Sequence, residues 1–467
     1  MIKIMKKIVI IGAGPAGLTS GLILSQAGFQ VMVYEADPQY VGGLSKTIEY
    51  KGYRFDIGGH RFYSKDQEVR SFWQQLMGND LLLQQRSSRI YYKRKLLRYP
   101  LDLGDILFKL PPSDFISFIA SWIKSQLKPP RAENNFESWM IARFGEKLFN
   151  AFFKTYTEKV WGRECRHISS DWADQRIQNL SIWEVFKSFF NKTQVKSMTQ
   201  TFEYPKLGPG MLWERVMQEV RVKGGTVELG IKVKSLHQQE QGWEVLTECG
   251  QRTQADFVIN SMPLTNLLKS INNTPENILE LARGFEYRAF ITVAIMFKGK
   301  NPFTEQWIYI QEPSVLVGRI QNYQNWSPFM VPTADHCCLG LEYFCQFQDE
   351  LWMKTDFELF ELAIRELDLL DISYSKNELD FKVIRQPYAY PIYDLDYQQR
   401  LAEIRAFLKE QTNLYSVGRS GLHRYNNQDH SIKTAMLVCE NIIRDQFVFD
   451  PWMVNQDAEY IEEVSDP

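Results

Sequence analysis

A glycine-rich turn between a short apolar strand and a helix most constrains what this chain can fold into. Residues 7–11 form an apolar, largely β-branched run, residues 12–17 read GAGPAG, and apolar residues resume at helical spacing from Leu18 to Ala27. Residues 30–34 then predict a second strand. Glycines in this context let the backbone approach a pyrophosphate at the N-terminus of a helix. The pattern predicts a βαβ unit that binds a dinucleotide.

Three further segments indicate which dinucleotide is bound. Glu35 ends the second strand, where a carboxylate can accept both ribose hydroxyls of the cofactor. Residues 41–45 (VGGLS) leave room for an extended cofactor, and they resemble a second fingerprint of the flavin amine oxidase and protoporphyrinogen oxidase superfamily. Residues 415–419 (YSVGR) resemble the C-terminal flavin motif of that superfamily, in which a helix N-terminus stabilises negative charge on reduced flavin. We therefore expect the cofactor to be FAD.

The expected cofactor-binding residues are spread over the whole chain. They are Gly12, Gly14, Pro15, Ala16, Gly17, Glu35, Gly42, Gly43, Leu44, Ser45, Gly59, His60, Val233, Gly418, Arg419, Asn427, Gln428 and Ser431. Asp429 and Ser431 also stand near the predicted start of a helix, which either side chain can cap.

Composition excludes several classes of function. The 467 residues carry 54 Lys and Arg against 56 Asp and Glu, so no long-range field favours nucleic acid. The six cysteines form no CxxC pair, so we expect no zinc or other metal site and no disulfide framework. No run approaches the roughly 18 consecutive apolar residues of a membrane span. The apolar run near Met1 predicts a buried strand and not a signal peptide, so we expect a cytoplasmic protein.

The order of predicted elements indicates interleaved domains. Helices are expected at 101–128, 135–149, 181–190 and 431–446, and strands at 226–229, 232–236, 243–247, 255–260, 290–297, 307–310, 315–320, 337–344 and 413–417. FAD-binding parts are expected at 1–75, 205–270 and 401–467, a helical substrate region at 76–204, and an antiparallel-sheet substrate region at 271–400. The fold class is α/β, with a Rossmann-type FAD-binding domain interleaved with a substrate domain made of a helical part and a mostly antiparallel sheet.

Further segments, taken in order, resemble the UDP-galactopyranose mutase family, and its longer eukaryotic-type branch more than its short bacterial one. They are the histidine loop at 58–64 (GGHRFYS), Tyr99-Pro100-Leu101, residues 156–161 (YTEKVW) with Trp172 and Arg176, Trp307-Ile308-Tyr309 with Arg319, residues 325–328, Tyr390-Pro391, and residues 418–431 (GRSGLHRYNNQDHS). Each segment alone is a weak signal, and their order along the chain is specific.

The resemblance assigns a substrate site to residues of suitable chemistry. Substrate-binding residues are expected at Tyr99, Asp102, Thr157, Trp161, Trp307, Tyr309, Tyr390 and Tyr425. Arg176 and Arg319 are expected to be catalytic, because two planar guanidinium groups can grip the diphosphate of a sugar nucleotide. The third expected catalytic residue is His60, whose imidazole can hydrogen-bond flavin or polarise a substrate hydroxyl near neutral pH.

Two positions depart from the family pattern. Thr157 stands where the family has the Asn of its Y-N-x-K-V-W segment, and Asp102 stands where a Gln usually follows the uridine-side motif. A carboxylate at position 102 would alter recognition of the base. The sugar and the base of the substrate therefore stay open.

The resemblance implies a mutase in which N5 of reduced flavin attacks the anomeric carbon of a sugar nucleotide, with no net redox change. NADPH is the expected external reductant, and a sugar nucleotide is the expected small-molecule partner. Two alternatives use related folds. One is an FAD-dependent oxidoreductase of the amine oxidase and protoporphyrinogen oxidase type, and the other is a non-catalytic binding protein resembling the Rab GDP-dissociation inhibitors. The sequence indicates no oligomeric state.

Overall fold

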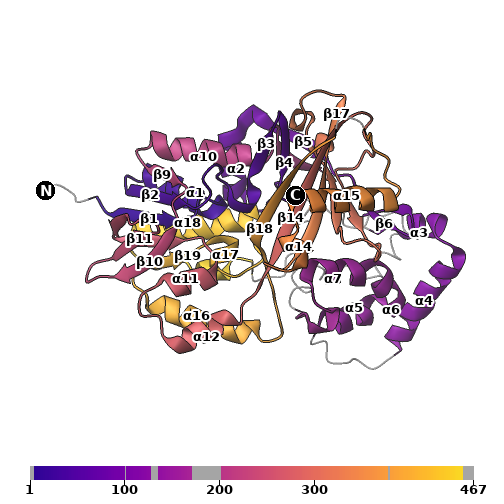
Figure 1. The fold of residues 1–467 in the computed structure, drawn as a ribbon. Coiled ribbons are helices and arrows are strands. Elements are labelled where there is room, and N and C mark those ends of the chain that lie inside the picture. Colours follow the sequence, from indigo (N-terminus) through magenta and orange to yellow (C-terminus); the bar gives the residue numbers. More distant parts are fainter. Residues whose placement is uncertain (1–4, 100, 128–134, 171–200, 377–378, 456–467) are drawn as a thin grey trace.

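The computed structural model describes residues 5–99, 101–127, 135–170, 201–376 and 379–455. Figure 1 shows two units side by side, one around a parallel sheet and one around a larger, mostly antiparallel sheet. The chain passes between them several times, because strands of the parallel sheet come from its beginning, its middle and its end.

The first unit contains a parallel sheet in the order β19-β13-β1-β2-β9. Its strands are β1 (Lys7–Ile11), β2 (Gln30–Glu35), β9 (Thr226–Leu229), β13 (Phe257–Asn260) and β19 (Leu414–Ser416), and every neighbouring pair is parallel. Successive residues of β1 face opposite sides of the sheet. Ile8 and Ile10 belong to one hydrophobic core, whereas Val9 and Ile11 belong to another. Both faces of the sheet are therefore covered, as parallel sheets require.

Different elements cover the two faces. The core around Ile8 and Ile10 is completed by α1 (Pro15–Gln26), α2 (Gln67–Met77), α10 (Gly210–Val222) and α18 (Gln428–Arg444). The core around Val9 and Ile11 is completed by the antiparallel strands β10 (Val233–Gln238), β11 (Trp243–Thr247) and β12 (Arg252–Ala255), and by α11 (Leu264–Ser270), α12 (Glu276–Arg283) and α16 (Tyr397–Glu410). These elements form the left-hand unit in Figure 1.

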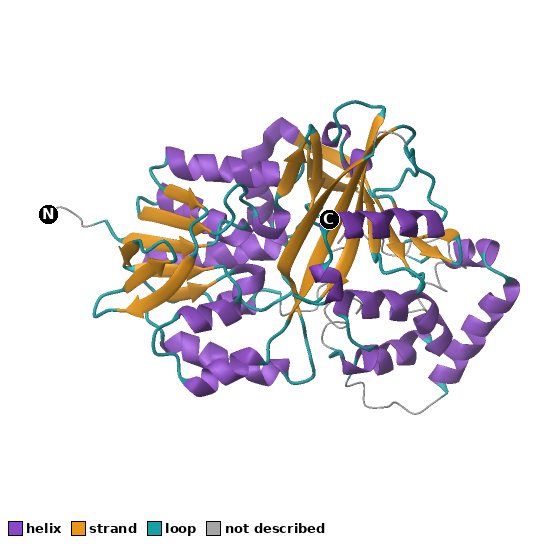
Figure 2. Cartoon of the chain, in the orientation of Figure 1, coloured by secondary structure: helices purple, strands orange, loops and turns teal. Residues whose placement is uncertain are grey.

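The second unit contains a sheet in the order β18-β14-β17-β16-β15-β6-β7, drawn in orange in Figure 2. Its strands are β6 (Ser88–Tyr92), β7 (Lys95–Arg98), β14 (Tyr287–Lys298), β15 (Trp307–Ile310), β16 (Arg319–Asn322), β17 (His336–Cys345) and β18 (Asp380–Pro391). Neighbouring strands are antiparallel except β6 and β15, which are parallel. Helix α15 (Asp356–Leu369) packs on this sheet through Leu359, Ala363 and Leu367.

A helical part lies beside this sheet. It contains α3 (Leu103–Lys109), α4 (Pro112–Gln126), α5 (Phe136–Phe144), α6 (Glu146–Phe149) and α7 (Thr155–Trp161), with a π-helical turn at Asn150–Lys154 between α6 and α7. Its core includes Phe290 and Phe344 from the sheet. The helices and the sheet therefore form one unit.

Short elements complete the described chain. The remaining strands and helices are β3 (Thr47–Tyr50), β4 (Tyr53–Asp56), β5 (Leu81–Gln85), β8 (Thr201–Pro205), α13 (Tyr323–Trp326), α14 (Glu350–Met353) and α17 (Gly418–Gly421). The 3-10 turns are Gly43–Ser45, Gly78–Asp80, Cys165–His167, Pro328–Met330 and Pro451–Met453.

This architecture confirms the predicted fold class. Strands β1, β9, β11 and β15 begin and end at the predicted residues. Within the range 76–204, β6 and β7 precede the expected helices and join the larger sheet, and within 271–400, α12 packs against the parallel sheet. The helix expected at 181–190 lies outside the described residues.

Several predictions of local structure were wrong or missing. The helix expected at 135–149 is two helices, α5 and α6, and the strand expected at 255–260 is divided between the end of β12 and β13. The single helix expected at 101–128 is two helices, because Pro111 and Pro112 cannot continue α3. The strand expected at 315–320 begins only at Arg319. Strand β18 was not predicted, because Pro387 lies inside it at an irregular pairing between Arg288 and Phe290 of β14.

Two glycines of α1 allow a matched test of the glycine turn. A Cβ atom at Gly17 would lie 1.9 Å from the carbonyl oxygen of Gly12, whereas one at Gly21 would lie 3.3 Å from the side chain of Val33. Both Ala substitutions gain the same helix propensity. We expect Gly17→Ala to lower the free energy of unfolding of the apoprotein by about 1–3 kcal/mol more than Gly21→Ala in denaturant titrations. Equal effects would mean that close packing at Gly17 is not required.

Candidate active site

A cavity of about 800 Å³ opens between the two units. Its lining comes from the β1–α1 turn, the end of β2, the turn at Gly43–Ser45, the loop at 58–63, the start of β10, the β13–α11 loop, strands β15, β16 and β18, and the α17–α18 segment. Segments that are far apart in the sequence therefore meet at one place. The volume lies within the range of roughly 300–1,000 Å³ typical of ligand pockets.

The glycine turn and Glu35 form one end of this cavity. Gly12 has a φ of +95°, which favours glycine, and its N–H donates to the carbonyl of Tyr34 over 2.7 Å. Each carboxylate oxygen of Glu35 accepts one backbone N–H, from Ala13 over 2.6 Å and from Asp37 over 2.9 Å. Burial raises the pKa of Glu35. Because a carboxylate oxygen can accept two hydrogen bonds, Glu35 keeps acceptor capacity for ribose hydroxyls.

Three observations show that this end fits a dinucleotide. Gly14 caps α1 without a side-chain hydrogen bond, so no described side chain covers the first N–H groups of that helix. A Cβ atom at Gly43 would lie 3.3 Å from Cα of Gly14, so the two glycine segments face each other closely. Nε2 of Gln428 is buried at the cavity without a protein partner, while its Oε1 accepts from Nε1 of Trp213 over 3.2 Å. A buried donor without a partner indicates a ligand acceptor.

His60 lies on the cavity wall as a neutral imidazole. Its Nε2 donates to the carbonyl of Ile57 over 2.7 Å, because a carbonyl can only accept. Burial, together with the nearby charges of Arg419 and Arg319, lowers the pKa of His60 to about 4. The side chain is therefore uncharged near neutral pH, and it adds no positive charge to the site.

Arg319 enters the cavity as half of a buried ion pair. Its Nε donates to Oε2 of Glu342, which is fully buried. Oε1 of Glu342 accepts from Nε2 of Gln321 over 3.0 Å, and Oε1 of Gln321 accepts from Nε1 of Trp326 over 3.0 Å. The charge of Glu342 raises the pKa of Arg319 still further above its high ordinary value. The guanidinium is therefore permanently charged and is held in one orientation.

The outer nitrogen atoms of Arg319 are available to a ligand. Within the described part of the chain, Nη1 and Nη2 have no hydrogen-bond partner. Nη2 lies 3.7 Å from the position that a Cβ atom of Gly58 would take, beside the loop that carries His60. These nitrogen atoms can grip an anionic group with two parallel hydrogen bonds.

Aromatic side chains wall the cavity next to Arg319. Trp307 stacks on Trp326 with ring centroids 5.2 Å apart, and its buried Nε1 has no protein partner. The ring of Tyr309 contacts the rings of Tyr156 at 5.2 Å and of Tyr99 at 4.9 Å. This wall excludes water and offers one indole donor to a ligand.

A second pair of aromatic side chains contacts Arg419. The rings of Tyr390 and Tyr425 stack at 5.5 Å, and the Arg419 guanidinium lies 5.0 Å and 4.2 Å from their respective centroids. The Tyr390 hydroxyl is buried, and its pKa is raised mainly by that burial. Arg419 therefore joins Arg319 and Arg61 among the arginines that line the cavity.

Most of the predicted site residues line this cavity. They are Gly12, Gly14, Pro15, Ala16, Glu35, Gly43, Leu44, Ser45, Gly59, His60, Val233, Trp307, Tyr309, Arg319, Tyr390, Gly418, Arg419, Tyr425, Asn427, Gln428 and Ser431. The N–H of Asn427 also donates to Nδ1 of His430 over 3.1 Å at the start of α18, so this segment both caps the helix and reaches the cavity.

Six predicted residues do not line it. Gly17 and Gly42 instead allow close packing beside the two glycine turns. A Cβ atom at Gly17 would lie 1.9 Å from the carbonyl oxygen of Gly12, and one at Gly42 would lie 2.9 Å from Trp213. Behind the aromatic wall lie Tyr99, Thr157 and Trp161. The ring centroids of Trp161 and Tyr425 are 6.2 Å apart, and Thr157 is buried in α7. Asp102 is exposed and caps α3 by accepting the N–H of Asp105 over 2.6 Å, which explains its carboxylate without a role in base recognition. Arg176 lies outside the described residues.

The structure adds residues that the sequence did not single out. Gln386 and Tyr388 line the cavity together with Tyr390, because alternate residues of β18 share one face. The alternation of residues 386, 388 and 390 could have indicated these cavity residues from the sequence, but Pro387 made the segment look unlike a strand. Glu342 on β17 and Gln321 on β16, which no motif indicated, hold Arg319 together with Trp326 on α13, a residue of the 325–328 segment.

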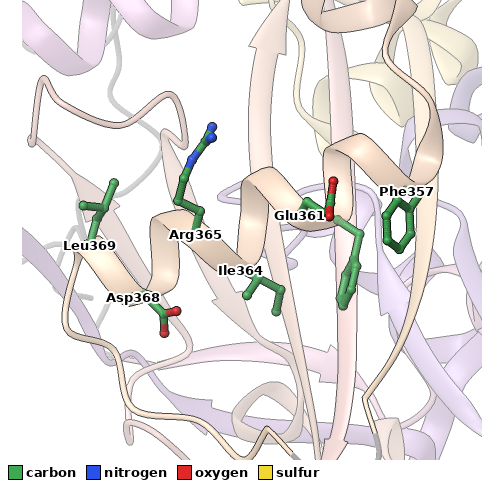
Figure 3. A pocket seen from close by; sticks show the side chains of 7 residues that line it. Phe357, Glu361, Ile364, Arg365, Asp368 and Leu369 are labelled. Atoms are coloured by element: carbon green, nitrogen blue, oxygen red, sulfur yellow. The ribbon is translucent and has the colours of Figure 1, made fainter.

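A second hollow lies on the outer side of α15 and is shown in Figure 3. All seven of its lining residues, from Phe357 to Leu369, come from this one helix. No second element therefore encloses a ligand there. Separately, none of the helices in the described ranges is long and apolar enough to cross a membrane.

The geometry defines a class of protein in which a Rossmann-type unit and a substrate unit share one cofactor cavity. A model of the family described as flavin containing amine oxidoreductase matches residues 15–418. This chain belongs to that family. The residues around Gly12, Glu35, Gly43 and Gln428 fit FAD, which is the cofactor that the family implies.

Comparison with individual proteins gives shorter sequence matches. The dTDP-fucopyranose mutase of Escherichia coli is 27% identical over 173 residues, which is 35% of this chain and 44% of that protein. The 1-hydroxycarotenoid 3,4-desaturase of Flavobacterium sp. (strain P99-3) is 50% identical over 58 residues, 12% of each chain. In both cases, the match spans less than half the length of the relative.

Comparison with solved structures covers nearly the whole chain. Reduced UDP-galactopyranose mutase superposes with a TM-score of 0.84 at 23% identity, over 97% of this chain and 99% of that one. A putative protoporphyrinogen oxidase from Exiguobacterium sp. 255-15 superposes with a TM-score of 0.74 at 15% identity, over 94% and 99%. At these identities, the likeness shows the fold.

Removing the partner of Arg319 tests the buried ion pair. Glu342→Gln leaves a buried guanidinium without its counter-charge, so we expect the free energy of unfolding to fall by about 3–5 kcal/mol in urea titrations. Asp356→Asn breaks the pair between Asp356 and Arg385, in which the aspartate is 54% exposed, and should cost less than about 1 kcal/mol. A loss at Glu342 no larger than that of the control would contradict the structural role of the pair.

The neutral state of His60 predicts a pH dependence of stability. The folded protein keeps His60 uncharged down to pH about 4, whereas an unfolded chain binds a proton below pH about 6.5. Stability should therefore fall as pH drops from 6.5 to 4, by about 3 kcal/mol in total from this residue. His60→Gln should lack this component. The difference in unfolding free energy between wild type and variant, measured from pH 7 to pH 4.5, checks it, and parallel curves would refute it.

Proposed function

We propose that this protein is an FAD-dependent sugar-nucleotide mutase related to UDP-galactopyranose mutase. The observation that carries the proposal is Arg319, a permanently charged guanidinium with two outer nitrogen atoms facing the cavity beside the indole donor of Trp307. An anionic, hydrogen-bonding substrate suits this wall. The partial likeness to dTDP-fucopyranose mutase and the shared fold with UDP-galactopyranose mutase support the same class of substrate.

In this proposal, FAD is held by the glycine turn, Glu35, the Gly43–Ser45 turn and the N-terminal end of α18. When bound and reduced, the flavin supplies a nucleophilic nitrogen, N5, that can react at the anomeric carbon of a sugar without net redox change. NADPH is the proposed external reductant. The described residues hold one parallel Rossmann-type sheet, which FAD occupies in this proposal.

The protein residues have separate roles in this proposal. Arg319 binds the diphosphate and stabilises the negative charge that it gains when the glycosidic bond breaks. Arg176 is proposed as its partner from the sequence resemblance. His60, being neutral, donates to Ile57 from Nε2 and lies on the cavity wall, where its imidazole can contact the cofactor or a sugar hydroxyl. Tyr390 and Tyr425 wall the cavity and orient Arg419.

Family membership favours a second candidate, an FAD-dependent oxidoreductase. Matches to the L-amino-acid oxidase of Crotalus adamanteus, 40% identical over 67 residues, and to the carotenoid desaturase accompany the family model. A carboxylate of an oxidisable substrate would also suit Arg319. The two candidates differ in their products, because a mutase isomerises its substrate and an oxidoreductase withdraws electrons from it.

The substitution of Arg319 tests the proposed substrate class. We expect Arg319→Ala to weaken binding of UDP or dTDP to the holoenzyme by about 2 kcal/mol or more, roughly thirtyfold in Kd, and Arg319→Lys to lie between wild type and Ala. Calorimetric titration measures both. Unchanged affinity in a folded, flavin-loaded Ala variant would place the diphosphate elsewhere.

Product analysis separates the two candidates. Chemically reduced holoenzyme, given a panel of UDP- and dTDP-hexoses, should return a ring-isomerised sugar nucleotide while the flavin stays reduced. No isomerised product across the panel, combined with reduction of oxidised flavin by an amino acid, would favour the oxidoreductase.

A further inference from the structure

The loop between β15 and β16 spans residues 311–318 and delivers Arg319 to the cavity. Tyr309 precedes it and Arg319 follows it directly. The N–H of Gly318 donates to the carbonyl of Glu342 over 2.9 Å, and a Cβ atom at Gly318 would lie 2.7 Å from the ring of Phe344. The end of the loop therefore has little room to shift, and its position sets that of Arg319.

Lys159, on α7, holds this loop from one side. Its Nζ donates to three backbone carbonyls, those of Glu312 at 2.7 Å, Val317 at 3.1 Å and Ile310 at 3.4 Å. These three carbonyls belong to both ends of the loop. One ammonium group therefore ties the beginning of the loop to its end.

Glu366, on α15, holds the same loop from the other side. The residue is 3% exposed, and its two carboxylate oxygens accept the N–H groups of Leu316 at 2.6 Å and of Val317 at 3.0 Å. It lies on the inner side of the helix whose outer side is drawn in Figure 3. The loop is thus held between a cation that binds carbonyls and an anion that binds N–H groups, and each charge favours the other.

The side chain of Gln311, at the start of the loop, inserts between backbone groups at the beginning of α7, the helix that carries Lys159. In a regular α-helix the N–H of Tyr156 would donate to the carbonyl of Phe152. Here Oε1 of Gln311 accepts that N–H over 3.1 Å, and Nε2 of Gln311 donates to that carbonyl over 2.7 Å. The inserted amide lies at the end of the π-helical turn Asn150–Lys154. It also fixes Tyr156, whose ring contacts Tyr309.

We infer that Lys159, Glu366 and Gln311 are positioning residues that set Arg319 and Tyr309 for the diphosphate of the substrate. None of the three lines the cavity. They join α7, α15 and the loop into one polar unit behind the substrate wall. This inference rests on the proposed function, because it takes the ligand of Arg319 to be a diphosphate.

Because Lys159 holds the loop through its positive charge, the loop should be sensitive to alkaline pH. Burial lowers the pKa of Lys159 to about 8, while the carboxylates that face it, Glu366 on α15 and Glu312 in the loop, oppose that shift. Above this pH the neutral amine has two hydrogens for three carbonyls and loses its attraction to both carboxylates. Nucleotide affinity should therefore weaken as pH rises through 8.

The test compares Lys159→Met, Lys159→Arg and wild type as full-length, FAD-loaded proteins, with UDP and dTDP as probes. We expect Lys159→Met to raise Kd about tenfold or more, because a small displacement of a binding group is costly, and Lys159→Arg to restore part of the loss. The wild-type rise in Kd between pH 7 and pH 9 should be absent in Lys159→Met. Hydrogen exchange should accelerate at the amides of Leu316 and Val317.

A matched control separates positioning from general destabilisation. Asn441 is 1% exposed on α18 and likewise holds a loop by three bonds, two accepted from Val448 and Phe449 and one donated to Phe449. Asn441→Leu should lose stability without changing Kd. In an Arg319→Ala background, Lys159→Met should add less to the loss of affinity than it costs in wild type, since most of its effect acts through Arg319.

The outcomes distinguish the inference from the proposed function. Wild type that binds neither UDP nor dTDP would contradict the proposed function and the inference with it. Wild-type binding with an unchanged Kd in Lys159→Met, or additive losses in the double variant, would overturn the positioning role alone.

Discussion

The pairing of β13 with β1 on one side and with β19 on the other is the constraint on which the rest of this structure depends. These three parallel strands come from distant parts of the chain, and parallel neighbours need long crossover connections. The connections here contain the strands and helices of the second unit. Closing the sheet with the three-residue strand β19 brings the α17–α18 segment back to the glycine turn. One cavity between two units is therefore a consequence of strand order.

Charge inside the cavity is handled by two different physical means. Arg319 stays ionised because Glu342 compensates it, and the outer face of Arg319 is left for a ligand. His60 has no such counter-charge and lies near two guanidinium groups, so it is neutral. The wall consequently carries positive charge without a competing titration near neutral pH. This pattern favours an anionic ligand over a cationic amine, and it keeps the proton on Nε2 of His60 fixed by the carbonyl of Ile57.

The cofactor half of the site could be predicted from sequence because local backbone chemistry defines it. A positive φ at Gly12, close helix packing at Gly17 and a carboxylate at the end of β2 each depend on a few adjacent residues, so the residue types themselves carry the signal. The substrate half depends on strands from separate regions. Tyr390 could be named from a motif, but Gln386 and Tyr388 could not, because Pro387 hid the alternation of β18.

The prediction for Asp102 shows why motif matching was weaker at the substrate end. Its place after Tyr99 suggested contact with a base, whereas the carboxylate caps α3 and faces solvent. An Asp directly before a helix, accepting the N–H three residues further on, is a common cap, and that local explanation was available from sequence alone. The residues that do organise the substrate end, Glu342 and Glu366, lie on β17 and α15 and have no local signature. Their importance arises only from burial beside a cation or backbone N–H groups that come from another part of the chain. Long-range electrostatic complementarity of this kind is a property of the assembled fold, and for this reason the substrate end of the site could not be predicted from local sequence.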